Sequence, residues 1–143
     1  MSHAGMVGSA GALGQALLAH LRGDALVRGV FGDVPRVLDE VGGAKPLYPY
    51  MVIARHEVVP AHGCEVQIED HVIDLHIMTR WAGRNGAREA MGDVLSVLEN
   101  ADMSLEGHKL VWCYVAFSDV LSLRDGQTFK GVVRLKLRTT PLQ

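Results

Sequence analysis

The segment from residue 71 to residue 81, HVIDLHIMTRW, alternates apolar and polar residues, and this pattern constrains the fold more than any other. Successive side chains of a β-strand point to opposite faces, so the alternation predicts a strand that is buried on one face. The residues predicted to face the core are Ile73, Leu75 and Ile77, and those predicted to face away from it are Asp74, His76 and Arg80. Such a strand belongs in a sheet that another layer covers on one side.

Helical spacing follows this strand along the chain. The apolar residues that gather on one side of the predicted helix are Ala87, Met91, Val94, Leu95 and Leu98. A similar stripe near the N-terminus consists of Leu13, Ala16, Leu17, His20 and Leu21. Gly23 would end this first helix, and Asp24 would cap a short helical turn from Ala25 to Phe31.

Three further segments have the composition of strands: residues 50–59 (YMVIARHEVV), 109–123 and 128–138. Asp125-Gly126 predicts a hairpin between the last two, and residues 36–41 are a shorter strand candidate. The order of helices and strands predicts an α+β fold, with two helices packed on one face of a mainly antiparallel sheet of four to five strands. We expect residues 1–10 to form a flexible tail and residues 11–143 to form a single domain.

The two strands of the expected hairpin each have two different faces. In the first, one face would carry Val111, Cys113, Val115 and Phe117, and the other would carry Trp112, Tyr114, Ala116 and Ser118. In the last strand, the core would receive Phe129, Val133, Leu135 and Leu137. The outward face of that strand would carry Val132 with four cations, Lys130, Arg134, Lys136 and Arg138.

Charge is divided unevenly along the chain. Residues 127–143 carry +4 without any acidic residue, whereas the whole chain carries −2, so residues 1–126 carry −6. This division suggests subunits that meet through complementary surfaces. Because aromatic residues beside cations are typical of contact surfaces, we take one set as candidates for a subunit interface or a lumen lining: Lys130, Arg134, Lys136, Arg138, Trp112 and Tyr114. A solvated outer face of a sheet explains the same cations equally well.

The composition is that of a globular protein, with 48% apolar and 21% charged residues among 143. A chain of this length fits one domain that folds without disulfides or metals. Its pI near 6.4 lacks the basic excess typical of nucleic-acid-binding proteins. Cys64 and Cys113 are too few for a disulfide framework and favour a reducing, cytosolic setting. The start of the chain lacks the pattern of a signal peptide, and no apolar stretch approaches the roughly 20 residues that span a bilayer, so we expect no membrane association.

The residues suited to metal binding or nucleophilic catalysis do not form a recognisable site. His71 and His76 would lie on opposite faces of their strand. Asp74 and His76 share a face, but a zinc site needs at least three protein ligands and the spacing indicates no third. His62 and Cys64 could bind a metal or form a nucleophile pair, yet nothing marks an orienting group or an oxyanion site beside them.

Two other patterns are equally weak. Ser118, Asp119 and His108 lack the G-x-S-x-G surroundings of a catalytic serine. The stretch 83–86, with Arg84 and Arg88, could hold an anion at a helix N-terminus, although an ordinary turn explains it as well. We therefore expect no catalytic residue, no metal and no cofactor, and we do not expect an enzyme.

The order and spacing of several segments resemble the tail-completion proteins of tailed bacteriophages and of prophage-derived gene transfer agents, a family related to the tail terminators. The resemblance covers about residues 12–140. The segments that carry it are ALGQALLAHL, PYMVI, DLHIMTRWAGRNGAREAMGDVLSVLENA, LEGHKLV and FSDVLSLRDGQTFKGVVRLKLRT. The glycine-rich start of the chain does not belong to the pattern.

The resemblance implies a structural virion protein that assembles into a hexameric ring. Such a ring caps the completed tail tube, contacts the tail tube protein and the head-side connector or stopper protein, and surrounds DNA only as passing cargo. It implies assembly in the host cytoplasm and a final place at the head–tail junction. The loop between Pro60 and Glu69 would reach an axial partner, and its candidate contact residues are His62, Cys64, Glu65 and Gln67. The alternatives are a small α+β ligand-binding module and a nucleic-acid-binding protein.

Overall fold

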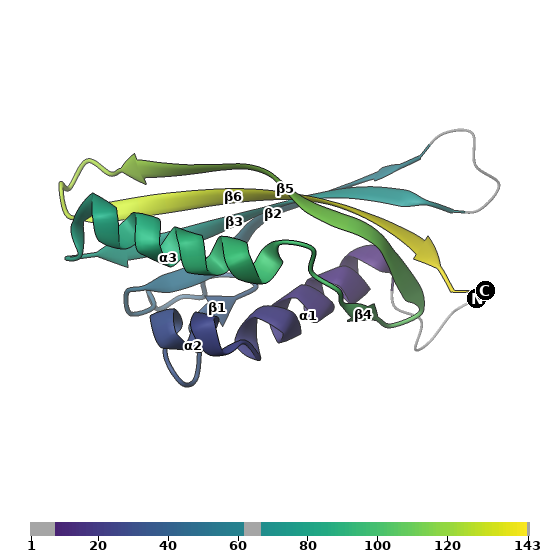
Figure 1. The fold of residues 1–143 in the computed structure, drawn as a ribbon, viewed down its shortest axis with the longest axis horizontal. Helices are drawn as coiled ribbons and strands as arrows, with labels where there is room; N and C mark the ends of the chain where they lie inside the picture. Colours follow the sequence, from purple (N-terminus) through teal and green to yellow (C-terminus); the bar gives the residue numbers. More distant parts are fainter. Residues whose placement is uncertain (1–7, 62–66, 143) are drawn as a thin grey trace.

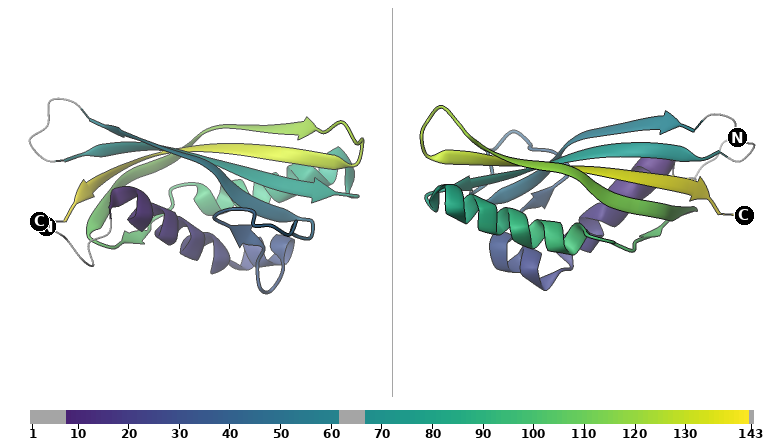
Figure 2. Two further views of the ribbon diagram at one scale, coloured as in Figure 1. Left: turned by 180° about the vertical axis from the view of Figure 1, so that it is seen from behind. Right: turned by 45° about the horizontal axis from the view of Figure 1, so that its top comes forward.

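The computed structural model describes residues 8–61 and 67–142 (Figure 1). In chain order the elements are α1 (Ser9–Arg22), α2 (Ala25–Phe31), β1 (Val37–Leu38), β2 (Tyr50–Pro60), β3 (Glu69–Arg80), α3 (Gly83–Leu98), β4 (Ser104–Leu105), β5 (His108–Ser122) and β6 (Thr128–Pro141). The strands form one six-stranded sheet in the order β1-β2-β3-β6-β5-β4. Only the β1–β2 pair is parallel. The helices lie on one face of this twisted sheet, as the two further views show (Figure 2).

The predicted α+β class, with a mainly antiparallel sheet and helices on one face, is confirmed. The sheet has six strands rather than four to five, because β4 was not predicted and the candidate at residues 36–41 forms β1, which pairs through only two residues. The short turn that Asp24 caps is a third helix, α2. Helix α1 already begins at Ser9, so two residues assigned to the N-terminal tail are helical.

A single apolar core lies between the helices and the sheet. Its fully buried residues include Leu13, Leu17 and Leu21 of α1, Val94 and Leu98 of α3, Ile73 and Leu75 of β3, and Val133, Leu135 and Leu137 of β6. Each such side chain contributes about 2 kcal/mol on burial. Helices α1 and α3 have no side-chain hydrogen bond at their N-caps. Packing of their apolar stripes, rather than capping, therefore holds both helices on the sheet.

The two short edge strands cover only part of the sheet. Strand β1 pairs with Met51 and Val52 of β2, and β4 pairs with His108 and Lys109 of β5. Beyond β1, the β2–β3 hairpin continues to Pro60 and Glu69 while β6 and β5 run alongside. One end of the sheet is therefore a four-stranded ribbon, in which the β2–β3 hairpin projects past the helices (Figure 1).

Gly131 of β6 lets helix α3 approach the sheet closely. A Cβ atom at this position would lie 2.8 Å from Cε of Met91 and 3.3 Å from Cβ of Ile77. Gly131 is buried beneath α3, so no solvent-filled space is open to a larger side chain. The absence of a side chain at residue 131 thus leaves room for the tip of Met91 between α3 and β6.

We expect Gly131→Ala to lower the free energy of unfolding by about 1 kcal/mol, because the terminal methyl of Met91 must shift and Cβ of Ile77 lies only 3.3 Å away. The matched control is Gly92→Ala in α3, where a Cβ atom meets nothing within 4 Å. That control should raise stability by about 0.5–1 kcal/mol through helix propensity. Urea denaturation of both variants measures the difference, and equal effects would contradict the close approach of α3.

A buried histidine links three strands beneath the ribbon end of the sheet. His71 is only 1% exposed, and its Nδ1 shares a 2.8 Å hydrogen bond with Nε2 of His56. Its Nε2 lies 2.9 Å from Oγ1 of Thr139. Burial, and secondly the neighbouring His56, lowers the pKa of His71 to about 4. The side chain is therefore neutral at pH 7 and connects β2, β3 and β6.

This pKa predicts a loss of stability in mild acid. Because the folded pKa lies below the ordinary value of 6.5, the unfolded chain binds the proton first, and stability falls as the pH drops from 6.5 towards 4. The loss attributable to His71 should reach about 2 kcal/mol at pH 5. Urea denaturation between pH 7 and 5 measures it. His71→Gln should flatten the pH dependence, whereas His108→Gln should leave it in place; an unchanged slope in the His71 variant would refute the assignment.

Candidate interaction surface

The sheet face opposite the helices, here called the open face, carries all six residues proposed from sequence as an interface. The strand register aligns Trp112 with Arg138 and Tyr114 with Lys136. Lys130 and Arg134 follow on the same side of β6, since alternate residues of a strand share a face. The six residues therefore form one continuous surface across β5 and β6. Its role as a subunit interface or a lumen lining stays a prediction.

Two of the four cations are neutralised by acids of the neighbouring strand. Arg134 donates to both carboxylate oxygens of Asp74, over 2.9 and 3.2 Å. Arg138 donates to both carboxylate oxygens of Asp70, over 2.6 and 2.9 Å. The bond from Arg138 lowers the pKa of Asp70, and Asp74 raises the pKa of Arg134. The face was expected to be basic, but it is a paired ladder of acids and arginines with additional lysines.

The same arginines also contact aromatic rings on β5. The guanidinium of Arg138 lies 5.3 Å from the ring centre of Trp112, and that of Arg134 lies 5.4 Å from that of Phe117. Each arginine is thus held between a carboxylate on β3 and a ring on β5. Such contacts help to fix the arginine side chains, while 36% of Trp112 and 44% of Phe117 remain exposed.

Phe117 was expected to share a face with Cys113 and Val115 and instead lies on the open face. It aligns with Arg134 in the β5–β6 register, and 44% of its surface is exposed. The register shifts between Leu110 and Trp112 and again between Val115 and Phe117. A β-bulge adds a residue and reverses the alternation that follows it, which a strict two-residue period cannot anticipate. Ser118 consequently turns to the helix side.

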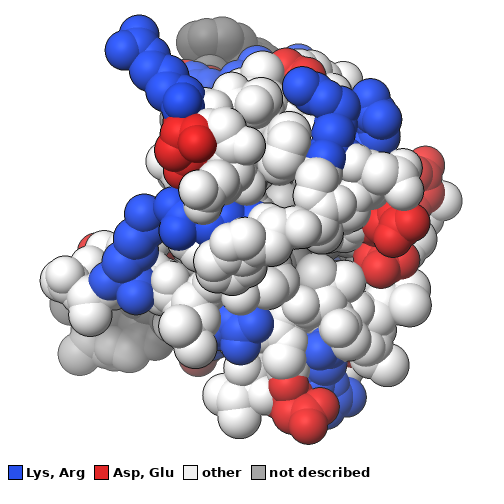
Figure 3. Space-filling view, turned by 90° about the vertical axis from the view of Figure 1, so that its left-hand side faces the viewer, with Lys and Arg blue, Asp and Glu red and all other residues white. Residues whose placement is uncertain are grey.

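The open face exposes a row of large apolar side chains along β5. Trp112, Tyr114, Phe117 and Leu121 have exposed fractions of 36%, 48%, 44% and 43%. We take this row as the candidate contact surface, because exposed apolar patches on folded proteins commonly mark interaction sites. The end of the molecule at the β5–β6 turn carries charges of both signs, without a large patch of one sign (Figure 3).

The proposed axial-partner loop falls largely on residues that the structure does not describe. His62, Cys64 and Glu65 lie outside the described residues. Gln67 is described and is exposed. The inferred role of this loop therefore stays a prediction.

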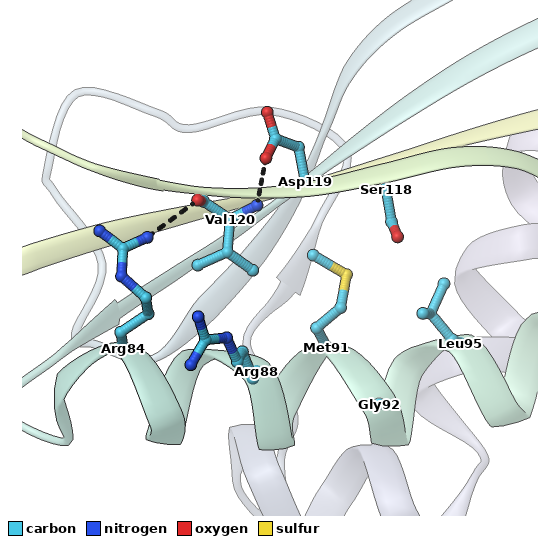
Figure 4. Close-up of a pocket in the computed structure, with 8 residues that line it drawn as sticks. All are labelled: Arg84, Arg88, Met91, Gly92, Leu95, Ser118, Asp119 and Val120. Carbon is cyan, nitrogen blue, oxygen red and sulfur yellow. Dashed lines mark hydrogen bonds between the residues drawn. The ribbon is translucent and has the colours of Figure 1, made fainter.

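A groove of about 400 Å³ lies between α3 and β5 (Figure 4). Its lining residues are Arg84, Arg88, Met91, Gly92, Leu95, Ser118, Asp119 and Val120. Arg84 donates to the carbonyl of Val120 over 3.2 Å, and the Asp119 carboxylate accepts from the Val120 amide over 2.8 Å. Arg84 and Asp119 thus both bind backbone groups of β5. Arg84 is the residue that was considered above for anion binding.

The other chemical groupings considered from sequence are not assembled. His108 lies at the far end of β5 from Ser118, so the serine, aspartate and histidine do not meet. His71 and His76 lie on opposite faces, as predicted, and Asp74 binds Arg134 rather than pairing with His76. Within the described ranges, no group of three or more His, Cys, Asp or Glu side chains could hold a metal ion. Burial raises the pKa of the Cys113 thiol to about 11, which keeps it protonated.

Comparison with known proteins identifies the family. The model of the family described as tail completion protein gp17 matches residues 15–140. The chain belongs to this family. The match spans almost the whole described fold, from α1 to β6. It confirms the resemblance to tail-completion proteins that the sequence indicated. Comparison with curated protein sequences found no match.

Two solved structures share the fold of this tail completion protein. A chain in the virion of a native gene transfer agent particle matches with a TM-score of 0.82 at 24% identity, over 94% of this chain and 99% of that one. The gp17 protein of bacteriophage SPP1 matches with a TM-score of 0.59 at 20% identity, over 92% of this chain and 89% of that one.

Among the described residues, no helix is long and apolar enough to cross a membrane.

Sequence reasoning missed the partners of the two arginines. Asp70 and Asp74 are four residues apart on β3, and Arg134 and Arg138 are four residues apart on β6. Equal spacing of opposite charges on two strands that alternate in the same way is the signal that could have revealed these pairs. This signal can be used only if β3 and β6 are known to be neighbours. The two strands are far apart in the sequence, so the sequence alone does not show that they pair.

We expect Asp74→Asn to lower the melting temperature by several degrees, because it leaves Arg134 and its bidentate bonds without a carboxylate at a mostly buried position. The Asp74 side chain is only 11% exposed. The control is Glu57→Gln, which breaks an exposed pair with Arg55, where both side chains are 46% exposed and little change is expected. Thermal unfolding followed by circular dichroism compares the two; a larger effect of the control would refute a structural role for the ladder.

Proposed function

We propose that this tail completion protein forms a ring, of six copies, that caps the tail tube and joins it to the head-side connector. The proposal extends the family assignment, which concerns tail completion, to a specific assembly. In it the protein acts through surfaces and transforms no substrate. It would assemble in the host cytoplasm and remain in the particle at the head–tail junction.

The observation that carries the proposal is the open face of the sheet. Within the described residues nothing covers this face, although Trp112, Tyr114, Phe117 and Leu121 are all exposed on it. A monomer in solution would gain by covering such a row. In a ring the open face lies either against a neighbouring subunit or towards the lumen, where tightly packed DNA passes.

A ring requires contacts between unlike surfaces. Strand β6 offers Lys130 and Lys136 for such a contact, because Asp74 and Asp70 bind its two arginines, Arg134 and Arg138. A contact of one patch with a different patch on the next copy generates a closed ring when the rotation closes. Each contact should bury more than about 1,000 Å², as stable protein interfaces do.

The paired ladder also suits a lumen through which DNA passes without being retained. Asp70 and Asp74 neutralise Arg138 and Arg134, so the surplus positive charge on β6 comes from Lys130 and Lys136. A face with few free cations would release few counterions from DNA, and its DNA binding would be weak and only modestly dependent on salt. This argues against the alternative of a nucleic-acid-binding regulator.

Charge reversal at Lys136 tests the proposal. Lys136 is exposed and aligned with Tyr114, so Lys136→Glu changes the open face without breaking the ladder. We expect a roughly ten-fold lower yield of particles with joined heads and tails, which corresponds to about 1.4 kcal/mol lost in the contact. Electron microscopy of purified particles gives the count.

Arg88→Glu is the matched control, because Arg88 is exposed on the helical side of the molecule. It should leave assembly near normal. Normal assembly of the Lys136 variant together with failure of the Arg88 variant would place the contact on the helices and reject the proposed role of the open face.

A further inference from the structure

Two stretches of strand edge have no partner within the described chain. Strand β2 is paired on its outer side only at Met51 and Val52, and β5 only at His108 and Lys109. Beyond these positions, the outer edges of β2 and β5 meet no further strand among the residues that the structure describes. Unpaired N–H and C=O groups on an edge are templates for another strand.

These two edges lie at the same level of the sheet. Glu57 aligns with Val72 of β3, Val72 with Lys136 of β6, and Lys136 with Tyr114 of β5. A second row connects Val59 with Trp112, through Asp70 and Arg138. Between the bulges, residues 56–59 of β2 and residues 112–115 of β5 therefore bound a regular four-stranded ribbon on its two sides.

The direction of the strands suits a contact between copies. Every neighbour within the ribbon is antiparallel, so β2 and β5 run in opposite directions. Copies related by rotation about an axis along the strands keep their directions. The β5 edge of one copy then meets the β2 edge of the next at the same level and in antiparallel orientation, without any shift along the axis.

We propose that residues 56–59 of β2 pair with residues 112–115 of β5 in the next copy, so that the sheets form one continuous antiparallel wall around the ring. This inference rests on the proposed ring and names the contact that closes it. A contact of two different edges of the same chain is heterologous and leads to ring closure rather than to a two-fold dimer. The partner of each edge is thus a second copy of this chain.

The side chains on the two edges match in this register. On the open face, Val59, which is 46% exposed, meets Trp112, which is 36% exposed. Glu57 on the same face meets Tyr114. Pairs of aromatic and β-branched residues directly across two strands are among the favourable ones in sheets. The acid of Glu57 also comes near the cation of Lys136, which is aligned with Tyr114.

At the other end of the β5 edge, side chains already occupy backbone groups, so another strand could not pair there. There the side chains of Arg84 and Asp119 occupy the carbonyl and the amide of Val120, and α3 lies alongside (Figure 4). No side chain of the described residues makes a hydrogen bond to the backbone of residues 56–59 or 112–115. Natural proteins block unwanted pairing at sheet edges with such protecting features. On β5 the protecting side chains lie only near Val120, so residues 112–115 remain available to another strand.

Disulfide cross-linking in assembled particles tests the pairing. The variant combines Glu57→Cys and Tyr114→Cys, with Cys64→Ser and Cys113→Ala to remove the native thiols. Within one copy the two positions are three strand spacings apart, roughly 14 Å, which exceeds the roughly 7 Å limit for a disulfide. Any bond must therefore join two copies. Oxidised particles should give a ladder of covalent multimers up to the full ring on non-reducing gels.

The matched control combines Val52→Cys with Asp119→Cys, which share one row and the open face of the same strands but lie at the end where β1 covers β2; it should give no ladder. Each single-cysteine variant should stay monomeric, and dimers from Glu57→Cys alone would reveal a two-fold contact and overturn the inference. If the first variant is not incorporated into particles, Val59→Cys with Trp112→Cys tests the neighbouring row by the same criteria.

The test separates this inference from the proposed ring. Glutaraldehyde treatment of particles reports neighbouring copies whatever their contact. Multimers with glutaraldehyde but no disulfide ladder would reject the edge pairing and keep the ring. Only monomers with glutaraldehyde would reject the ring and the edge pairing together.

Discussion

The pairing of β3 with β6 is the interaction on which the rest of the structure depends. These two central strands are aligned over twelve rows, from Glu69–Thr139 to Arg80–Thr128. One face of the pair supplies the floor of the core, and the other carries the bonds of Asp70 to Arg138 and of Asp74 to Arg134. A shift of one residue would bury the four charges and expose the apolar rows. Both faces therefore enforce the same register.

The sequence indicated which residues of each strand share a face wherever the alternation is regular. Ile73, Leu75 and Ile77 lie on the predicted side because β3 contains no bulge against β6. The same reasoning failed at Phe117, because a bulge after Val115 reverses the period. Bulges depend on how two strands fit together, and residues 115–117 contain no glycine or proline that would mark one.

The candidate surface was predictable in its members but not in its electrostatics. Counting charges along β6 identified four cations correctly, yet their effect depends on acids that are 60 and 68 residues away in sequence. A net charge summed over a segment cannot show which charges are paired across strands. The edges of the sheet were likewise hidden, because the lengths of β1 and β4, only two residues each, follow from tertiary pairing rather than from local propensity.

One face of the sheet carries the apolar core, and in the proposed ring the other face carries contacts with other molecules. The helices bury the apolar rows on one face, and on the open face Asp74 and Asp70 fix Arg134 and Arg138 within the same chain. Fixing these side chains before contact reduces the conformational entropy that association must overcome. The open face and the free edges can therefore meet other surfaces with little rearrangement. A protein that acts by completing a larger particle requires this property, because its contacts must form without the folded domain being rebuilt.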